Sequence, residues 1–175
     1  MGRYLIAWST VDGHTLRICR HLQGRLEAAG HAVTLLPVAE AARADLGAHD
    51  VVVVGASIRY GNHRPDVLAF ANERLAALAG KPTAFFSVNI VARKPQKNRA
   101  ETNPYVRKFL ARVRWQPTLV DVFAGKLDYP RYRFFDRLMI RFIMLVTHGP
   151  TDPSAVVEFT DWDRVDAFAQ RLAAL

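Results

Sequence analysis

The chain has only one cysteine, Cys19, among 175 residues. A single cysteine excludes an internal disulfide framework and a zinc site built from several cysteines, and it suits a reducing compartment. Long apolar runs are also missing, because no stretch reaches the ~20 uninterrupted apolar residues that a membrane-spanning helix needs. The N-terminal run MGRYLIAWST lacks the charged-then-apolar pattern of a secretion signal. The sequence therefore predicts a protein without a membrane-spanning helix.

Strand-like and helix-like segments alternate along the chain. Half of the residues are hydrophobic, which suits a buried core, and no repeat or linker divides residues 1–175, so a single domain is expected. Strands are expected at 4–8, 31–37, 50–55, 83–88 and 119–125, with a short strand-like run at 156–160. Helices are expected at 15–29, 65–79, 102–114 and 161–175. This alternation predicts a doubly wound α/β domain with a parallel sheet covered on both faces.

Positive charge is concentrated in one part of the chain, although the net charge is +8 overall. From Arg93 to Arg141 there are 13 Lys and Arg against 4 Asp and Glu, a balance of +9, and the remainder carries 11 against 12, or −1. Such a basic region favours nucleic acid, an anionic membrane surface or an anionic small substrate as partner, unless it is simply a solvated face. No nucleic-acid-binding motif accompanies it, so no nucleic-acid partner is expected.

The segment Tyr129–His148, YPRYRFFDRLMIRFIMLVTH, combines apolar side chains with spaced arginines. If it is helical from about Arg131, one stripe holds Arg133, Arg137 and Arg141, while eight apolar side chains cover about the opposite half of the helix at ~100° per residue. Those side chains are Phe134, Phe135, Leu138, Met139, Phe142, Ile143, Leu145 and Val146. The stretch from about 126 to 154 is predicted to be an insertion between two short β runs.

Three interpretations of this insertion remain open. Its apolar half packs on the domain or on another subunit, or it lies in the interfacial layer of a membrane with the arginines reaching lipid headgroups. The third possibility is that the segment covers a ligand site at the edge of the sheet.

Three loops that follow predicted strands carry polar side chains and glycines. In a doubly wound sheet, ligands bind beyond the carboxyl ends of the strands. The first loop, Ser9–Thr15 (STVDGHT), precedes a helix, whose free N–H groups and positive dipole end favour a phosphate. The second is Gly55–Gly61 (GASIRYG) and the third is Ser87–Pro95 (SVNIVARKP). The first loop is neither a Walker loop nor a Gly-x-Gly-x-x-Gly turn, so phosphate binding at this edge of the sheet is a hypothesis that rests on all three loops.

At these loops the chain resembles the flavodoxin family. The family pattern Ser/Thr-x-Thr-Gly-x-Thr is matched by Thr10, Gly13 and Thr15, with Asp12 at the usual middle threonine. A carboxylate beside a phosphate is unfavourable, so the Asp12 side chain is expected to turn away or to cap the helix. The third loop lacks the family's usual aromatic residue. The resemblance implies a five-stranded flavodoxin-like sheet, FMN as cofactor and an insertion that splits the fifth strand, as in long-chain flavodoxins. Cofactor binding is accordingly assigned to Ser9, Thr10, Asp12, Gly13, His14, Thr15, Ser57, Ile58, Arg59, Tyr60, Gly61, Ser87, Val88 and Asn89.

Within that family, several runs look like the menaquinone-dependent protoporphyrinogen IX dehydrogenases. They are the three loops above, the YPRYR run with the DR and MI pairs between Tyr129 and Ile140, and TDW at Thr160–Trp162. The resemblance implies an enzyme of haem biosynthesis that oxidises protoporphyrinogen IX and reduces a respiratory quinone, menaquinone, at the cytoplasmic face of the cell membrane as a peripheral protein. Alternatives are an FMN-dependent NAD(P)H:quinone reductase and a non-enzymatic flavodoxin electron carrier.

No acid–base pair or metal-ligand set stands out in the sequence, so no catalytic residue is assigned and no metal is expected. His14 and His63 lie near the predicted cofactor loops and are interpreted as loop histidines. The propionates of the substrate or the headgroups of the membrane need cations. The candidates for that role are Arg93, Lys94, Lys97, Arg99, Arg131, Arg133, Arg137 and Arg141.

Overall fold

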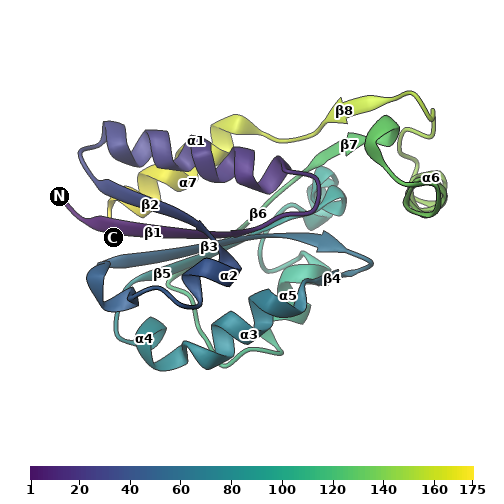
Figure 1. The fold of residues 1–175 in the computed structure, drawn as a ribbon. Helices are drawn as coiled ribbons and strands as arrows, with labels where there is room; N and C mark the ends of the chain where they lie inside the picture. The colour runs from purple at the N-terminus through teal and green to yellow at the C-terminus, as the bar shows by residue number, and fades with distance from the viewer.

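The centre of the protein is a parallel five-stranded sheet in the computed structural model, which describes all residues 1–175 (Figure 1). The strand order is β2-β1-β3-β5-β6, and the two-residue strand β4 pairs antiparallel with the end of β3. This is the flavodoxin-like order, in which the chain reverses direction across the sheet beside its first strand. The predicted fold class is confirmed. The strands are β1 (Arg3–Ser9), β2 (Ala32–Pro37), β3 (Val51–Arg59), β4 (Asn62–His63), β5 (Thr83–Val88) and β6 (Leu119–Phe123).

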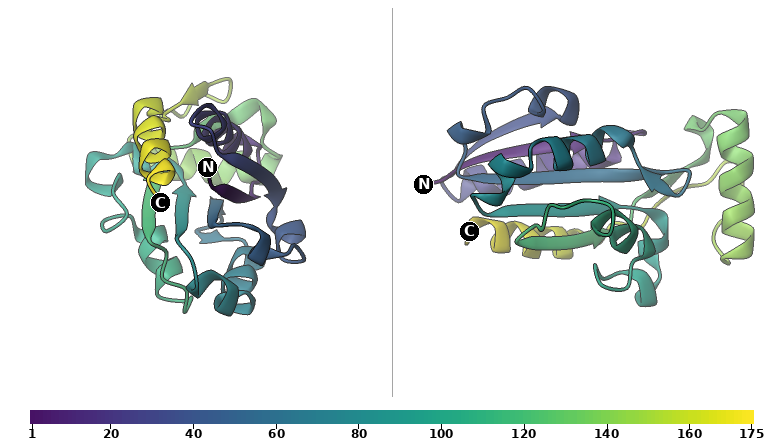
Figure 2. Two further views of the ribbon diagram at one scale, coloured as in Figure 1. Left: turned by 90° about the vertical axis from the view of Figure 1, so that its left-hand side faces the viewer. Right: turned by 90° about the horizontal axis from the view of Figure 1, so that it is seen from below.

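Helices cover both faces of the sheet. On one face, α1 and α7 pack over a cluster that includes Ile6, Leu22 and Phe168, and on the other face the remaining helices of the domain pack over a cluster that includes Val52 and Phe85 (Figures 1 and 2). Strands such as β3 and β5 are buried on both faces because their side chains are apolar at consecutive positions. The helices are α1 (His14–Ala28), α2 (Val38–Ala41), α3 (Pro65–Glu73), α4 (Leu75–Ala79), α5 (Pro104–Leu110) and α7 (Trp162–Ala173).

Two predicted helices are shorter or interrupted in the structure. The helix expected at 65–79 breaks at Arg74 into α3 and α4, because the Arg74 backbone (φ −98°, ψ 14°) leaves the helical range. The Arg74 guanidinium donates to the carbonyl oxygens of Ala42 and Ala44 at 2.8 and 2.9 Å. The helix expected at 102–114 is confined to α5, whose start is fixed by Asn103. The Asn103 side chain accepts hydrogen bonds from the backbone N–H groups of the first helical turn.

The insertion forms a separate unit beyond the carboxyl ends of the parallel strands. It contains β7 (Lys126–Asp128), the 3₁₀ turn η4 (Tyr129–Arg131), α6 (Phe134–Val146) and β8 (Val156–Glu158). β7 and β8 pair antiparallel with each other in their own two-stranded sheet, and neither belongs to the five-stranded sheet. The prediction that the insertion splits the fifth strand is therefore not confirmed. The helix also starts later than predicted, because Tyr132 and Arg133 have extended backbones.

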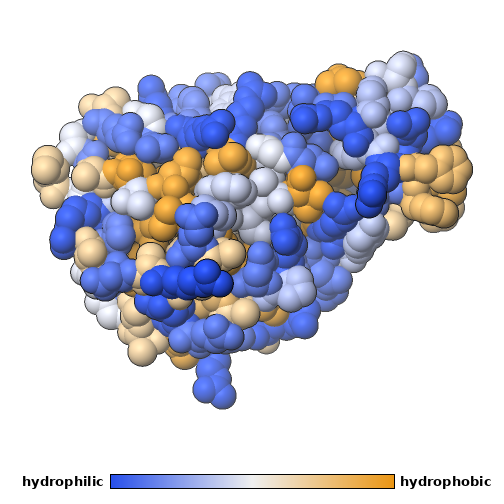
Figure 3. All heavy atoms as spheres, viewed as in Figure 1, coloured by the Kyte–Doolittle hydropathy of each residue, from blue (hydrophilic) through white to orange (hydrophobic).

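Helix α6 stands apart from the domain and is held mainly at its ends (Figure 2). Met144 is its only buried side chain, packed with Leu127 and Tyr129 in a small cluster under the insertion. Most of its other apolar side chains are exposed, which rules out complete packing of its apolar half on the domain. Figure 3 shows the resulting apolar surface at the end of the molecule where α6 lies. We call six of these side chains the outer face of α6: Phe134, Phe135, Leu138, Phe142, Leu145 and Val146.

Candidate functional site

A cavity of about 770 Å³ lies between the carboxyl edge of the sheet and the insertion. The three loops predicted to hold a cofactor form its inner walls, and β7, η4 and α6 form its outer side. Twelve of the fourteen predicted cofactor residues line it, and Ser9 and Ser87 do not. The twelve are Thr10, Asp12, Gly13, His14, Thr15, Ser57, Ile58, Arg59, Tyr60, Gly61, Val88 and Asn89.

The first loop leaves several hydrogen-bonding groups free at the start of α1. Gly13 has φ +86°, a left-handed conformation that a side chain would strain, and its N–H is bonded to the Thr10 hydroxyl at 3.0 Å. The helix has no side-chain cap and no acidic residue in its first turn, so the N–H groups at its positive end are not bonded by a side chain. Three buried hydroxyl oxygens around the loops have no hydrogen-bond partner in the protein: Ser9 Oγ, Thr15 Oγ1 and Ser57 Oγ. Of these, Thr15 and Ser57 line the cavity, and together with the N–H groups at the start of α1 they fit a phosphate.

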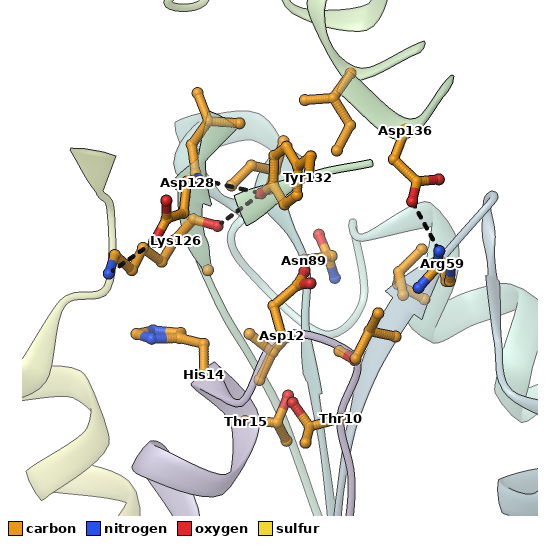
Figure 4. Close-up of a pocket in the computed structure, with 18 of the residues that line it drawn as sticks. Thr10, Asp12, His14, Thr15, Arg59, Asn89, Lys126, Asp128, Tyr132 and Asp136 are labelled. Atoms are coloured by element: carbon orange, nitrogen blue, oxygen red, sulfur yellow. Dashed lines mark hydrogen bonds and ion pairs between the residues drawn. The ribbon is translucent and has the colours of Figure 1, made fainter. Parts of the chain in front are cut away.

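Asp12 points into the cavity above Thr10 and Thr15 (Figure 4). The cap of α1 is Gly13, and no side chain caps the helix, so the expectation that Asp12 caps it is wrong. Desolvation raises the pKa of the Asp12 carboxyl above its ordinary value, an effect that the nearby Arg59 partly offsets. The carboxyl makes no ion pair, and it is free to rotate when a phosphate enters the loop.

The second loop is tied to α6 through Asp136. The Asp136 carboxylate accepts a hydrogen bond from Arg59 Nη2 at 2.8 Å and from the Tyr60 hydroxyl at 2.5 Å. The guanidinium of Arg59 also lies over the Tyr60 ring, 5.1 Å from its centre. We call these three residues the Asp136 latch. Asp136 is the only acidic residue of α6, and it stabilises the first turn near the positive end of the helix dipole. The latch therefore fixes α6 relative to the second of the loops predicted to hold the cofactor.

The third loop is held by a buried polar network. Asn89 bonds Ser87 Oγ at 3.0 Å and exchanges hydrogen bonds with Asn103, and its Oδ1 caps the 3₁₀ turn η2 (Ile90–Arg93) through the Ala92 N–H. Ser87 Oγ lies 2.9 Å from His63 Nε2. The Ser87 hydroxyl is thus occupied inside the network and does not reach the cavity. This network positions the backbone of the loop rather than offering free side chains to a ligand.

Neither predicted loop histidine has the surroundings of a general base. His63 is 5% exposed and packs edge-on against the stacked rings of Phe85 and Phe109, and burial lowers its pKa to about 4. His14 Nε2 lies 2.6 Å from Thr160 Oγ1, whose hydroxyl donates to the Ala124 carbonyl. The Thr160 oxygen therefore accepts, and His14 donates from Nε2 as the neutral tautomer. The interpretation of both as loop histidines is wrong, because His14 is the first residue of α1 and His63 lies in β4.

Aromatic side chains reach the cavity from elements that the sequence did not connect with it. Besides Tyr60, the cavity is lined by Tyr105 from the start of α5 and by Tyr132 from the insertion. The Tyr132 hydroxyl lies 3.2 Å from the Asp128 N–H and 3.4 Å from the Lys126 carbonyl, and burial raises its pKa to about 12. The third loop has no aromatic residue of its own, and these three rings supply aromatic surfaces that suit a flat ring system.

The cations around the cavity are partly different from those predicted. Arg131 lines it, whereas the other predicted cations do not: Arg93, Lys94, Lys97, Arg99, Arg133, Arg137 and Arg141. Arg93 instead bonds the carbonyl and hydroxyl of Thr147, at 3.1 and 3.0 Å, behind the end of α6. Arg17, Arg20 and Lys126 line the cavity although they were not predicted. Only the tertiary structure brings these three residues, from α1 and β7, to the same opening.

The inner side of α6 contributes apolar residues that sequence reasoning had not assigned to the cofactor site. Asp136, Met139, Ile140, Ile143 and Met144 all line the cavity. Asp136 could have been found from the sequence, because it is a lone aspartate in an apolar and basic segment. The apolar residues could not, because the residue type does not tell whether a side chain faces the cavity or the solvent.

Comparisons with known proteins agree with this geometry. A family model described as a flavodoxin domain matches residues 5–154. The chain is 42% identical over 171 residues to the protoporphyrinogen IX dehydrogenase (quinone) of Escherichia coli (strain K12), covering 98% of this chain and 94% of the relative. It is 43% identical over 172 residues to the protein of the same name from Leishmania major, covering 98% and 74%.

Among solved structures, a flavodoxin from the domain Archaea aligns with a TM-score of 0.52 at 14% identity over 98% of this chain and 93% of that chain, which shows the fold alone. The flavodoxin domain indicates FMN as the cofactor, and the free hydroxyls, the uncapped start of α1 and the aromatic rings of the cavity fit it. The chain therefore belongs to the flavodoxin domain family, in the group that contains the quinone-type protoporphyrinogen IX dehydrogenases.

Proposed function

We propose that this protein oxidises protoporphyrinogen IX to protoporphyrin IX and delivers the electrons to a quinone, menaquinone in the cell, with FMN bound in the cavity. The carrying observation is the cavity itself, which combines an FMN-type phosphate loop with an outer wall from the insertion. The likeness to relatives of that name over 98% of the chain supports the same activity. When bound, FMN supplies the two-electron transfer between donor and acceptor.

The residues of the chain bind, orient and shield the reactants. The α1 N-terminus and the Thr10 and Thr15 hydroxyls hold the phosphate, and the second and third loops hold the ring system. Met139 and Ile143 of α6 keep the outer side of the cavity apolar, which limits the entry of water to the reacting groups. No side chain is needed as a dedicated acid or base for a hydride to leave the donor.

Cations at the opening of the cavity suit the propionates of the porphyrinogen. Arg20 and Arg131 line the cavity and take part in none of the ion pairs of the structure, so both are available to an incoming carboxylate. Lys126 lies at the same opening, paired with Asp128 at 3.4 Å. A dianionic substrate would gain more binding free energy from these cations than a neutral quinone.

The outer face of α6 supports a peripheral location at the cytoplasmic face of the cell membrane. Its six side chains are 58–77% exposed, and Arg141, at the border of that face, and Arg133, just before the helix, are exposed cations that suit anionic headgroups. No helix in the structure is long and apolar enough to cross a membrane. The 13 residues of α6 are about 20 Å long, which suits a helix lying in the interfacial layer.

An anaerobic assay of the FMN-loaded protein tests the proposal. Protoporphyrinogen IX and a menaquinone analogue are supplied together, and the formation of fluorescent porphyrin is followed with and without the quinone. We expect porphyrin to form repeatedly only when quinone is present. Porphyrin formation no faster than in the absence of protein would refute the activity. A parallel reaction with NADPH as donor separates the two alternatives, because rapid quinone reduction by NADPH would identify an NAD(P)H:quinone reductase, and no quinone reduction from either donor would leave an electron carrier.

A further inference from the structure

Helix α6 has two apolar faces that serve different sides of the molecule. At about 100° per residue, Met139, Ile140 and Ile143 fall on an arc distinct from that of the outer face. Met139 and Ile143 line the cavity and are 39% and 37% exposed, whereas the outer-face side chains line no part of it. We call Met139, Ile140 and Ile143 the inner face of α6. One helix therefore separates the cavity from the surroundings of the outer face.

The inner face lies across the cavity from the loops that hold the cofactor. Ligand pockets usually enclose about 300–1,000 Å³, and this cavity of about 770 Å³ is lined both by the three cofactor loops and by the inner face of α6. A second cavity, next to His63 and Phe109, has a volume of only about 10 Å³, which is too small for any ring. The Asp136 latch holds the two walls together by joining the second loop to the first turn of α6.

We propose that the space between the cofactor and the inner face of α6 is a single slot that porphyrinogen and quinone occupy in turn. This inference rests on the proposed function and names the binding site for both of its substrates. The porphyrinogen places its rings against Met139 and Ile143 and its carboxylates toward Arg20 and Arg131. The quinone uses the same apolar wall without the cations.

Alternation is consistent with the chemistry. In each cycle the donor would lose a hydride to the bound cofactor and a proton to the solvent, and the electron pair of the bond that held the proton would become the new double bond of the donor. After the donor has left, the quinone takes the hydride from the cofactor and a proton from the solvent and becomes the quinol. Bound FMN would keep the electron pair after the porphyrinogen leaves and until the quinone binds. The two substrates therefore never need to be present together.

Tryptophan substitutions on the two faces of α6 test the slot. Met139→Trp and Ile143→Trp fill it, and Leu138→Trp and Phe142→Trp are matched controls on the outer face of the same helix. Binding of protoporphyrin IX, the stable product, is measured on the FMN-loaded protein by its fluorescence, and menadione is added as competitor. We expect the inner-face variants to bind porphyrin at least about tenfold more weakly, the controls to match the unchanged protein, and menadione to displace porphyrin competitively.

Several results would overturn the inference. Simultaneous binding of porphyrin and menadione would show two sites, and a loss of porphyrin binding in the outer-face controls but not in the inner-face variants would place the rings elsewhere. The FMN dissociation constant and the circular dichroism spectrum of each variant show whether it is folded. Met139→Ala, which enlarges the slot without strain, replaces any variant that does not fold. The anaerobic porphyrin assay of the unchanged protein is separate: its failure refutes the proposed function, whereas a positive assay with non-competitive binding refutes only the shared slot.

Discussion

Truncating two phenylalanines of the outer face of α6 should release the protein from membranes without unfolding it. Phe135 and Phe142 are 77% and 65% exposed, so they contribute little to packing within the chain. The double change Phe135→Ala with Phe142→Ala keeps the helix, because alanine is the best helix former. The free energy of unfolding should therefore stay nearly constant while membrane affinity falls.

The expected loss of affinity follows from the exposed fractions. Full burial of a phenylalanine side chain is worth about 1.5–3 kcal/mol, and roughly 70% of that is available to a lipid layer at each position. The two substitutions together should remove about 2–4 kcal/mol of membrane binding, which is about 30- to 1,000-fold in the partition coefficient. The arginines beside the outer face remain, so residual binding should depend more strongly on salt and on anionic lipid.

Co-sedimentation with vesicles measures this effect. Vesicles with and without anionic lipid are compared at low and high salt, and thermal unfolding is recorded for each variant. Val156→Ala is the control, because Val156 is a 53% exposed apolar residue of the insertion that lies on β8 and not on α6. Equal vesicle binding by the double variant and the unchanged protein would refute the membrane role. So would a dimer of the unchanged protein that the double variant loses, because the outer face would then be a subunit interface.

Two further predictions concern the latch and a buried histidine. Asp136→Ala should raise the KM for protoporphyrinogen about three- to tenfold at unchanged FMN affinity, because the ion pair with Arg59 is partly exposed and worth about 1 kcal/mol. Asp136→Glu should recover part of this loss. Steady-state kinetics measure the effect, and an unchanged KM in Asp136→Ala would contradict a positioning role. The pKa of His63 is about 4 in the folded protein and about 6.5 when unfolded, so the unfolded state binds more protons between these values. Stability that is complete above pH ~6.5 is then lost by up to about 3 kcal/mol as the pH falls toward 4. Urea unfolding of His63→Leu should show a flatter pH dependence in this window, and the same slope as in the unchanged protein would show that another group is responsible.

The sequence was sufficient for the main sheet because each strand carries a local signal. β3 begins with four consecutive valines and β5 contains Ala84, Phe85 and Phe86 in a row, and the predicted bounds of β5 agree with the structure residue for residue. The helices were less predictable at their ends. At the break, Arg74 bonds carbonyl oxygens 32 and 30 positions away in the sequence, and no local pattern contains that contact.

Some residues of the candidate site could likewise be predicted from local sequence, and others could not. Residues of the first and second loops were accessible to sequence reasoning because the loops follow strands whose carboxyl ends must share one edge of the sheet. Ser87 shows the limit, since its hydroxyl is bonded to His63 and Asn89 and is turned away from the cavity. Tyr105, Arg20 and Tyr132 could not be assigned from sequence, because α5, α1 and the insertion converge on the cavity only in three dimensions.

The sequence by itself determined the parallel sheet, the phosphate loop and the presence of a basic, apolar helix between residues 126 and 154. It did so because burial and backbone hydrogen bonding impose periodic patterns that a short window of residues contains. The tertiary structure decided how that helix is used. Periodicity placed eight apolar side chains on one half of α6, but the pairing of β7 with β8 and the Asp136 latch fix the rotation of the helix about its axis. That rotation turns Met139 and Ile143 to the cavity and the outer face away from it, a division that depends on contacts distant in the sequence.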